Sequence, residues 1–242
     1  MFGRLRFIAL GLVVLSAGCA TPWRPEPMVK DFGLGHLIHP LDEPDRITLP
    51  ANCRERPDSC GKDHVYVFAI NGLNPLCTGN FNGMCCYLKD QGFTNTYFGQ
   101  PYTSFWFPDE IREIRERDPQ AKIVLIGFSW GANCVRSLAH KLDDDGTPVD
   151  LLVYLVGDTI WNTPYSRPPN VRRIVNIRAQ GLILLGGDLL FNGADIDGAR
   201  NEMLECRHIL APSRKETLTI MMEELLVQSC APVSRKRTQA SE

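Results

Sequence analysis

The chain has 242 residues, of which 44% are hydrophobic and 22% charged, with a formal net charge of −2. A chain of this length suits one domain with its own hydrophobic core. The nearly balanced charge gives no sign of a nucleic-acid partner, and we expect none, because proteins that bind nucleic acid usually carry a large basic surface.

The N-terminus has the pattern of an export signal. Arg4 and Arg6 precede an apolar stretch over residues 7–17, which is too short to span a bilayer as a mature helix. The sequence Leu-Ser-Ala-Gly-Cys then ends at Cys19. Small residues before a cysteine resemble the lipobox of bacterial lipoproteins, although Ser16 stands where Leu is commonest.

The lipobox resemblance implies that residues 1–18 are a signal peptide and that Cys19 carries a diacylglyceryl group. Acyl chains would then hold the protein on a membrane without a helix that crosses it. The expected location is the cell envelope, facing the periplasm or the exterior. The alternative is an ordinary cleaved signal peptide, in which Cys19 has no special role.

Eight further cysteines follow Cys19, and an exported protein meets an oxidising compartment in which disulfides form. Cys53 and Cys60 flank a short polar loop, and Cys77 is close in sequence to Cys85 and Cys86. The connectivity cannot be read from the sequence. Because no histidine stands at ligand spacing from these cysteines, we expect no metal site.

The predicted elements begin after a segment rich in proline. Residues 19–61 are interpreted as a lipid-anchored tether and an irregular N-terminal segment, with a short strand near residues 46–49. Continuous apolar runs then predict buried strands that alternate with helices. The strands are expected at residues 65–70, 94–99, 122–127, 151–156 and 171–177, and the helices at 83–91, 108–117, 132–142 and 214–228.

This alternation predicts an α/β domain over residues 62–230, with a mainly parallel sheet between helices on both faces. Residues 231–242 are expected to be a disordered tail. Ligands in such folds bind beyond the carboxyl ends of the strands.

The motif with the clearest chemistry is Gly-x-Ser-x-Gly over residues 127–131, between the strand at 122–127 and the helix at 132–142. A serine at a tight strand-to-helix turn has a strained backbone, and its neighbours must be glycine to avoid clashes. The N-terminus of the helix also lends positive potential to an oxyanion. This context predicts that Ser129 is a nucleophile.

Here the chain resembles the α/β-hydrolase superfamily, particularly its small lipases and esterases. Residues 67–73, Val-Phe-Ala-Ile-Asn-Gly-Leu, are similar to the strand of that family that ends in His-Gly and leads into the oxyanion loop. Asn71 replaces the histidine. The resemblance implies an α/β-hydrolase-like three-layer sandwich, with oxyanion donors from the backbone of Trp130 and of Leu73 or its neighbour. Gly72 would permit the close approach of the backbone.

The general base must be a histidine, because a serine hydroxyl has to lose its proton near neutral pH. His36 and His39 lie in the irregular segment, His64 begins a strand at the wrong end of the sheet, and His140 lies within a helix. His208 stands in a loop before the last helix, which resembles the loop of the family that carries the catalytic histidine.

The third member of a triad is a carboxylate that orients the imidazole. Asp158 lies just beyond the strand at 151–156, where it resembles the acid of the pancreatic-lipase branch. Most members place the acid after the following strand, where Asp188 and Asp195 are the candidates. We favour Asp158 and keep the other two open.

These residues predict a monomeric serine hydrolase that cleaves carboxylic esters or lipids through an acyl-enzyme and needs no cofactor. The short connection between residues 156 and 171 predicts minimal or no cap domain. An aromatic set suits an acyl chain or core packing equally: Tyr102, Phe105, Trp106, Phe107 and Trp130. The alternatives are a non-catalytic envelope lipoprotein that retains the fold, and another acyl transfer by the same residues.

Overall fold

The computed structural model describes residues 34–45, 47, 61–74, 76–157, 167–180 and 195–230. The predicted signal peptide, the lipidation site at Cys19 and the predicted C-terminal tail lie outside these residues. A strand was expected near residues 46–49. Of these residues the structure describes only Ile47, which is not in a strand.

One sheet of six strands forms the centre of the protein, and all its strands are parallel. Their order across the sheet is β2-β1-β3-β4-β5-β6. The strands are β1 (Val65–Ile70), β2 (Thr96–Gly99), β3 (Lys122–Phe128), β4 (Val149–Leu155), β5 (Val171–Ala179) and β6 (Arg200–Leu204).

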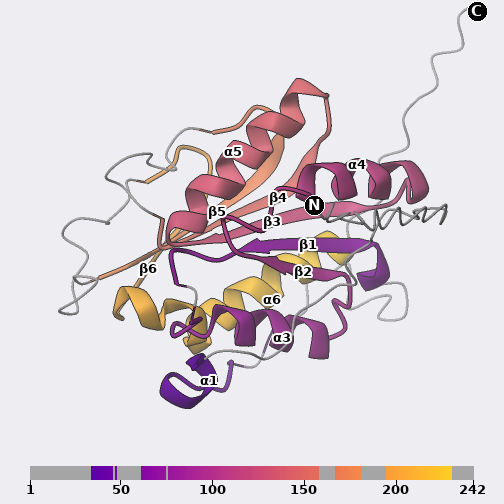
Figure 1. Ribbon diagram of the computed structural model, residues 1–242. Coiled ribbons are helices and arrows are strands. Elements are labelled where there is room, and N and C mark those ends of the chain that lie inside the picture. The colour runs from indigo at the N-terminus through magenta and orange to yellow at the C-terminus, as the bar shows by residue number, and fades with distance from the viewer. Residues whose placement is uncertain are drawn as a thin grey trace, which may run out of the picture.

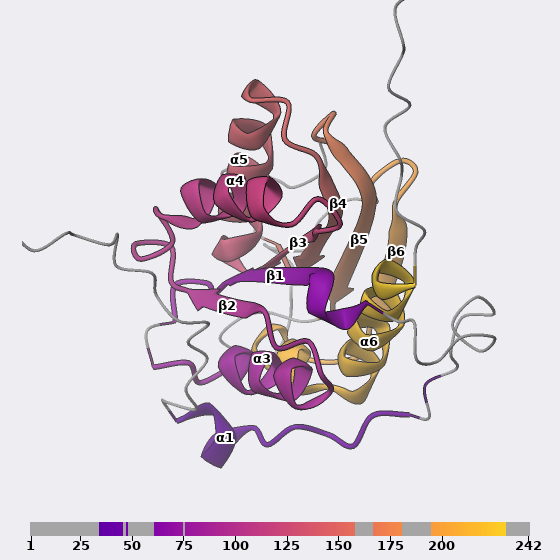
Figure 2. The same cartoon turned by 90° about the vertical axis from the view of Figure 1, so that its right-hand side faces the viewer.

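Helices cover both faces of this sheet (Figure 1). α4 (Phe107–Arg117) and α5 (Trp130–Asp144) lie on one face, and α3 (Phe81–Asp90) and α6 (Lys215–Ser229) lie on the other. A short α1 (Gly35–Ile38) lies beneath α3 in both ribbon views (Figure 2). The 3-10 helices are η2 (Lys62–His64) and η3 (His208–Ser213). The predicted α/β class, with a parallel sheet between helices on both faces, is confirmed.

The sheet divides the core into two apolar clusters. Side chains such as Val67, Val124 and Val153 point toward α3 and α6, whereas Phe68, Leu125 and their neighbours point toward α4 and α5. Strands buried on both faces require apolar side chains at successive positions, and this explains the unbroken runs in the sequence.

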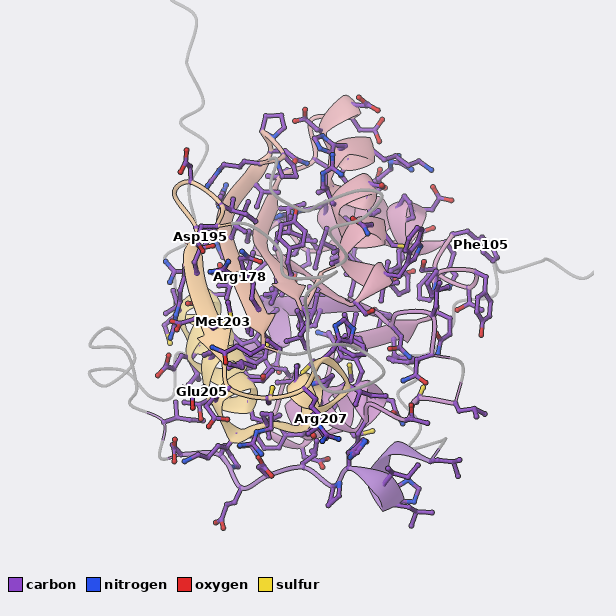
Figure 3. The ribbon with its side chains drawn as sticks, turned by 90° about the vertical axis from the view of Figure 1, so that its left-hand side faces the viewer. Phe105, Arg178, Asp195, Met203, Glu205 and Arg207 are labelled. Carbon is purple, nitrogen blue, oxygen red and sulfur yellow. The ribbon has the colours of Figure 1, made fainter. Side chains whose placement is uncertain are left out.

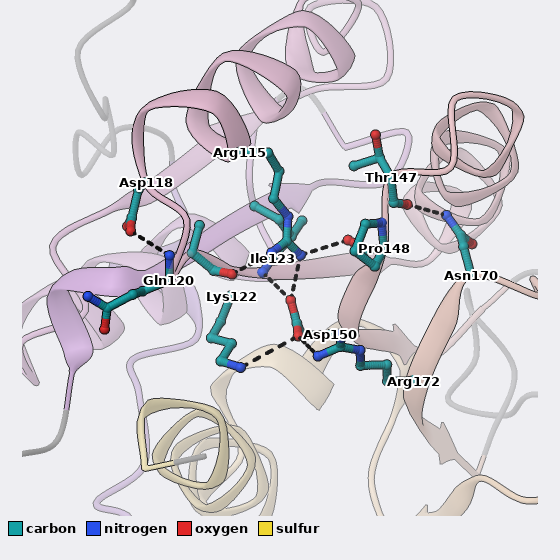
Figure 4. Close-up of polar contacts among 11 residues, drawn as sticks. Arg115, Asp118, Gln120, Lys122, Ile123, Thr147, Pro148, Asp150, Asn170 and Arg172 are labelled. Atoms are coloured by element: carbon teal, nitrogen blue, oxygen red, sulfur yellow. Dashed lines mark hydrogen bonds and ion pairs between the residues drawn. The ribbon is translucent and has the colours of Figure 1, made fainter. Parts of the chain in front are cut away.

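A buried carboxylate joins several elements at the end of the sheet where the strands begin (Figure 4). Asp150 of β4 is 2% exposed, and it accepts hydrogen bonds from Arg115 at 2.7 Å, Arg172 at 2.9 Å and the Ile123 amide at 2.9 Å. Lys122 lies 4.0 Å away. These contacts tie α4, β3 and β5 to β4, and we call them the Asp150 cluster.

The edge strand β6, which was not predicted, is held by ion pairs to α6. Arg200 donates to Glu223 at 3.0 Å and to the buried Glu224 at 3.1 Å. Glu224 also pairs with Arg173 of β5. None of the helices in the described part of the chain is both long and apolar enough to cross a membrane.

Candidate active site

Ser129 occupies the single position between the end of β3 at Phe128 and the start of α5 at Trp130. Its backbone has φ 55° and ψ −122°, outside the regions that residues other than glycine normally adopt. The Ser129 amide donates to the Leu155 carbonyl at 2.9 Å, which fixes the turn against β4. Such strain persists only where the surroundings enforce it, and it is frequent at functional sites.

The two glycines of the motif are required by close backbone contacts. A Cβ atom added at Gly131 would lie 2.0 Å from the Ile70 carbonyl oxygen, and one at Gly127 would lie 2.5 Å from a methyl group of Val135. No real side chain tolerates such distances. The sequence prediction of a sharp strand-to-helix turn around Ser129 agrees with this geometry.

Gly72, in the loop that follows β1, lies directly against Ser129. A Cβ atom added at Gly72 would be 2.7 Å from Ser129 Cβ and 3.2 Å from Ser129 Oγ. The loop therefore reaches the hydroxyl only because position 72 has no side chain. The next side chain along, Leu73, is 73% exposed.

The side chain of Asn71 organises this loop, which the sequence interpretation did not foresee. Its Oδ1 accepts the Gly72 amide at 2.9 Å, and its Nδ2 donates to the Asn74 carbonyl at 3.1 Å and contacts Cys77 Sγ at 3.5 Å. Asn71 is fully buried. The Gly72 amide is thus occupied within the loop. The sequence Asn-Gly-Leu-Asn over residues 71–74 is typical of a hydrogen-bonded turn, and this pattern could have indicated the role.

His208 is the first residue of η3, just after β6, and only 4% of it is exposed. Its ring centroid lies 5.4 Å from that of Phe128, the residue before Ser129. Ile209, the residue after His208, lies close to the same place. A Cβ added at Gly79 would be 2.9 Å from the Ile209 carbonyl oxygen and 3.3 Å from the Phe128 ring. The structure thus brings His208 to the end of β3 where Ser129 begins the turn.

The other histidines of the described residues lie elsewhere. His64 is at the opposite end of β1, where its Nδ1 is 2.8 Å from Asp118 Oδ2. His140 lies in the second half of α5, and His36 and His39 lie in and beside α1.

Of the three candidate acids, only Asp195 falls within the described residues. It is 67% exposed and forms an ion pair with Arg178 at 2.6 Å (Figure 3). Asp158 and Asp188 lie outside the described residues. Val156, two positions before Asp158, has φ 52°, which is unusual for a β-branched residue, and its amide donates to the Ile177 carbonyl at 2.7 Å.

The predicted aromatic set divides into core and surface. Phe107 is fully buried and packs edge-on against Phe68 and Trp106, with ring centroids 5.0 Å and 4.7 Å away. Tyr102 and Phe105 are 65% and 80% exposed. Phe105 projects from the side of the molecule opposite Asp195 (Figure 3).

The disulfide that Cys77 could have formed with Cys85 or Cys86 is absent, because none of these three cysteines is disulfide-bonded. Cys77 instead faces the amides of Asn71 and Gln100, the latter at 3.6 Å. Burial raises the pKa of the Cys77 thiol, and the two amides offset this only in part, so the group stays protonated at neutral pH. Cys53 and Cys60 lie outside the described residues.

No group of three or more metal-ligating side chains occurs among the residues that the structure describes. Neither protein-family models nor curated protein sequences give a match to this chain.

Several solved structures are similar to part of this chain. A predicted CIB-like hydrolase from Thermoplasma acidophilum is 12% identical, with a TM-score of 0.42 over 66% of this chain and 86% of its own. A putative hydrolase of the alpha/beta superfamily from Xanthomonas campestris pv. campestris is 14% identical, with a TM-score of 0.41 over 66% and 98%. Human thioesterase 2 is 8% identical, with a TM-score of 0.43 over 70% and 99%.

Proposed function

We propose that the protein is a serine hydrolase that cleaves carboxylic esters or lipids through an acyl-enzyme on Ser129. The observation that carries the proposal is the left-handed backbone of Ser129 (φ 55°) at a turn that places its hydroxyl against the Gly72 backbone. A hydroxyl in this position can act as a nucleophile if a general base and an oxyanion site lie within reach of it.

In the proposed reaction, Ser129 Oγ attacks the ester carbonyl carbon while His208 takes its proton. The tetrahedral intermediate collapses, the bond to the alcohol breaks, and the alcohol leaves with the proton from the imidazolium. Water then attacks the acyl group, passes its proton to His208 and releases the carboxylic acid, and Ser129 recovers its proton.

The oxyanion would be held by backbone amides. The Trp130 amide is at the N-terminus of α5, where helix amides have no partner within the helix and the dipole favours negative charge. Because Asn71 occupies the Gly72 amide, the second donor is assigned to Leu73. The role of Gly72 is to let the loop backbone approach Ser129, because glycine has no side chain.

A fluorophosphonate probe tests the nucleophile and the base. The wild-type chain should be labelled, Ser129→Ala should not, and His208→Ala should react slower by ~10³-fold or more. His140→Ala is the matched control and should react like the wild type. Folded wild-type protein that takes up no probe would favour the second candidate, a non-catalytic envelope lipoprotein that retains the fold.

For the acid we propose Asp158, because the Asp195 carboxylate is bound to Arg178. Ester turnover of Asp158→Asn should fall by roughly 10²- to 10⁴-fold, since the imidazole would lose the group that orients it. Asp188→Asn and Asp195→Asn are the controls. A severe loss in Asp188→Asn with a nearly normal Asp158→Asn would move the assignment to Asp188.

We further propose that Cys19 carries a lipid anchor that holds the protein, as a monomer, on a membrane of the cell envelope. The small residues before Cys19 support the anchor. Mass spectrometry of the mature N-terminus would show a diacylglyceryl cysteine, and Cys19→Ala should abolish it.

A further inference from the structure

Exposed hydrophobic side chains gather in three segments beside the candidate active site. The segments are residues 34–40, residues 71–80 apart from Pro75, and residues 100–106; together we call them the neutral flank. Among the described residues, the large exposed hydrophobic side chains outside it are Met203 and Val227. Those within it are Leu34, Leu37, Ile38, Leu73, Leu76, Tyr102 and Phe105.

Backbone hydrogen bonds bring the three segments together. The Leu34 amide donates to the Leu76 carbonyl at 3.0 Å, so α1 is attached to the loop that follows β1. That loop is attached to the segment after β2, because the Asn71 amide donates to the Gly99 carbonyl at 2.9 Å. The three segments are therefore neighbours in the fold, although they are far apart in the sequence.

The neutral flank also has no acidic residues, and its basic residues are the histidines His36 and His39. Its segments contain no Asp, Glu, Lys or Arg, whereas 22% of the whole chain is charged. Surface loops of soluble domains usually carry mixed charges, and contiguous apolar patches mark places where another apolar surface binds. Leu37, Leu73 and Phe105 are each more than 70% exposed, at 71%, 73% and 80%.

We propose that the neutral flank lies on the surface of a lipid bilayer, with its aliphatic and aromatic side chains inserted at the interface. The position of the chain before it supports this occupant. Leu34 follows Cys19 by 15 positions, so a lipid at Cys19 could be no more than ~50 Å from the flank along the chain.

The absence of Lys and Arg specifies the kind of membrane contact. Anionic lipids attract basic clusters, and the neutral flank has none, so zwitterionic lipid is sufficient for binding. Leu73 follows Gly72, which touches Ser129. A bilayer on the flank would therefore reach the mouth of the site. The link to catalysis rests on the proposed function, but the binding itself does not.

Hydrogen exchange on phosphatidylcholine vesicles tests the proposal with the full chain. With vesicles present, backbone amides of the three segments should exchange on the order of tenfold slower in the wild type than in the double variant Leu37→Asp/Phe105→Asp. Val227→Asp, a matched change at an exposed hydrophobic residue outside the flank, should retain the wild-type protection.

Two outcomes would overturn the proposal. One is that the wild-type protein does not bind the vesicles, or that it binds them but its flank amides exchange as fast as those of the double variant. The other is slow exchange without vesicles that increases with protein concentration, which would mean that a second copy covers the flank. Repeating the measurement with Ser129→Ala separates binding from catalysis, because its protection should equal that of the wild type whether or not the chain is a hydrolase.

Discussion

At the scale of single residues, the contact between Gly72 and Ser129 leaves no room for a methyl group. Gly72→Ala should lower the rate of fluorophosphonate labelling by at least ~10-fold, because the added carbon must displace either the serine or the loop that carries Leu73. Labelling kinetics measure this directly, and chemical denaturation reports any accompanying loss of stability.

Gly146→Ala is the opposite case and serves as the control. A Cβ atom there would touch nothing within 4 Å, but φ is 66°, so the substitution should cost about 1 kcal/mol of stability. Its labelling rate should stay normal. If both variants lose labelling in proportion to their stability, the contact at Gly72 has no specific role.

The residues of the site were predictable to different degrees. Ser129 stands in a motif whose glycines are dictated by backbone contacts, and local sequence reveals such contacts. The role of Asn71 was not evident, because it depends on bonds to Asn74 and Cys77 that only the folded loop creates. His208 was indicated by its place in a loop before the last helix, but no local pattern places its ring beside Phe128.

At the scale of elements, the Asp150 cluster joins one helix and three strands through one carboxylate. Asp150→Asn should lower the free energy of unfolding by roughly 2–4 kcal/mol, because it leaves Arg115 and Arg172 without their buried partner. Urea denaturation followed by circular dichroism measures the change.

A comparable charge at the surface provides the reference for that experiment. Asp145 pairs with Arg112, but its side chain is 44% exposed, so Asp145→Asn should cost only about 0–1 kcal/mol. Equal effects of the two substitutions would show that burial of the Asp150 carboxylate contributes little.

Charge also explains which strands were difficult to predict. β4 begins at Val149, two residues earlier than expected. A charged residue at position 150 does not indicate a buried strand, and Asp150 is accommodated there because Arg115, from a distant part of the chain, pairs with it. The sequence Arg-Asn-Glu-Met-Leu of β6 has no apolar run. Its strand conformation depends on pairing with β5 and on the bonds of Arg200 to α6. Such nonlocal support leaves no periodic signal.

At the scale of the whole molecule, the fold followed from the alternation of apolar runs with amphipathic segments. A strand buried on both faces has to be apolar throughout, so β1, β3 and the later part of β4 were visible in the sequence. The neutral flank was not foreseen, because its three segments are far apart in the sequence and come together only in the folded chain.

The two ends of the sheet have different chemistry. The Asp150 cluster fixes the strands relative to one another where they begin, and none of its residues belongs to the loops around Ser129. The alignment of the strand tips is thus set without help from those loops. Grafting new loops at the end of the sheet that carries Ser129 could therefore change the specificity while the register of the strands is preserved.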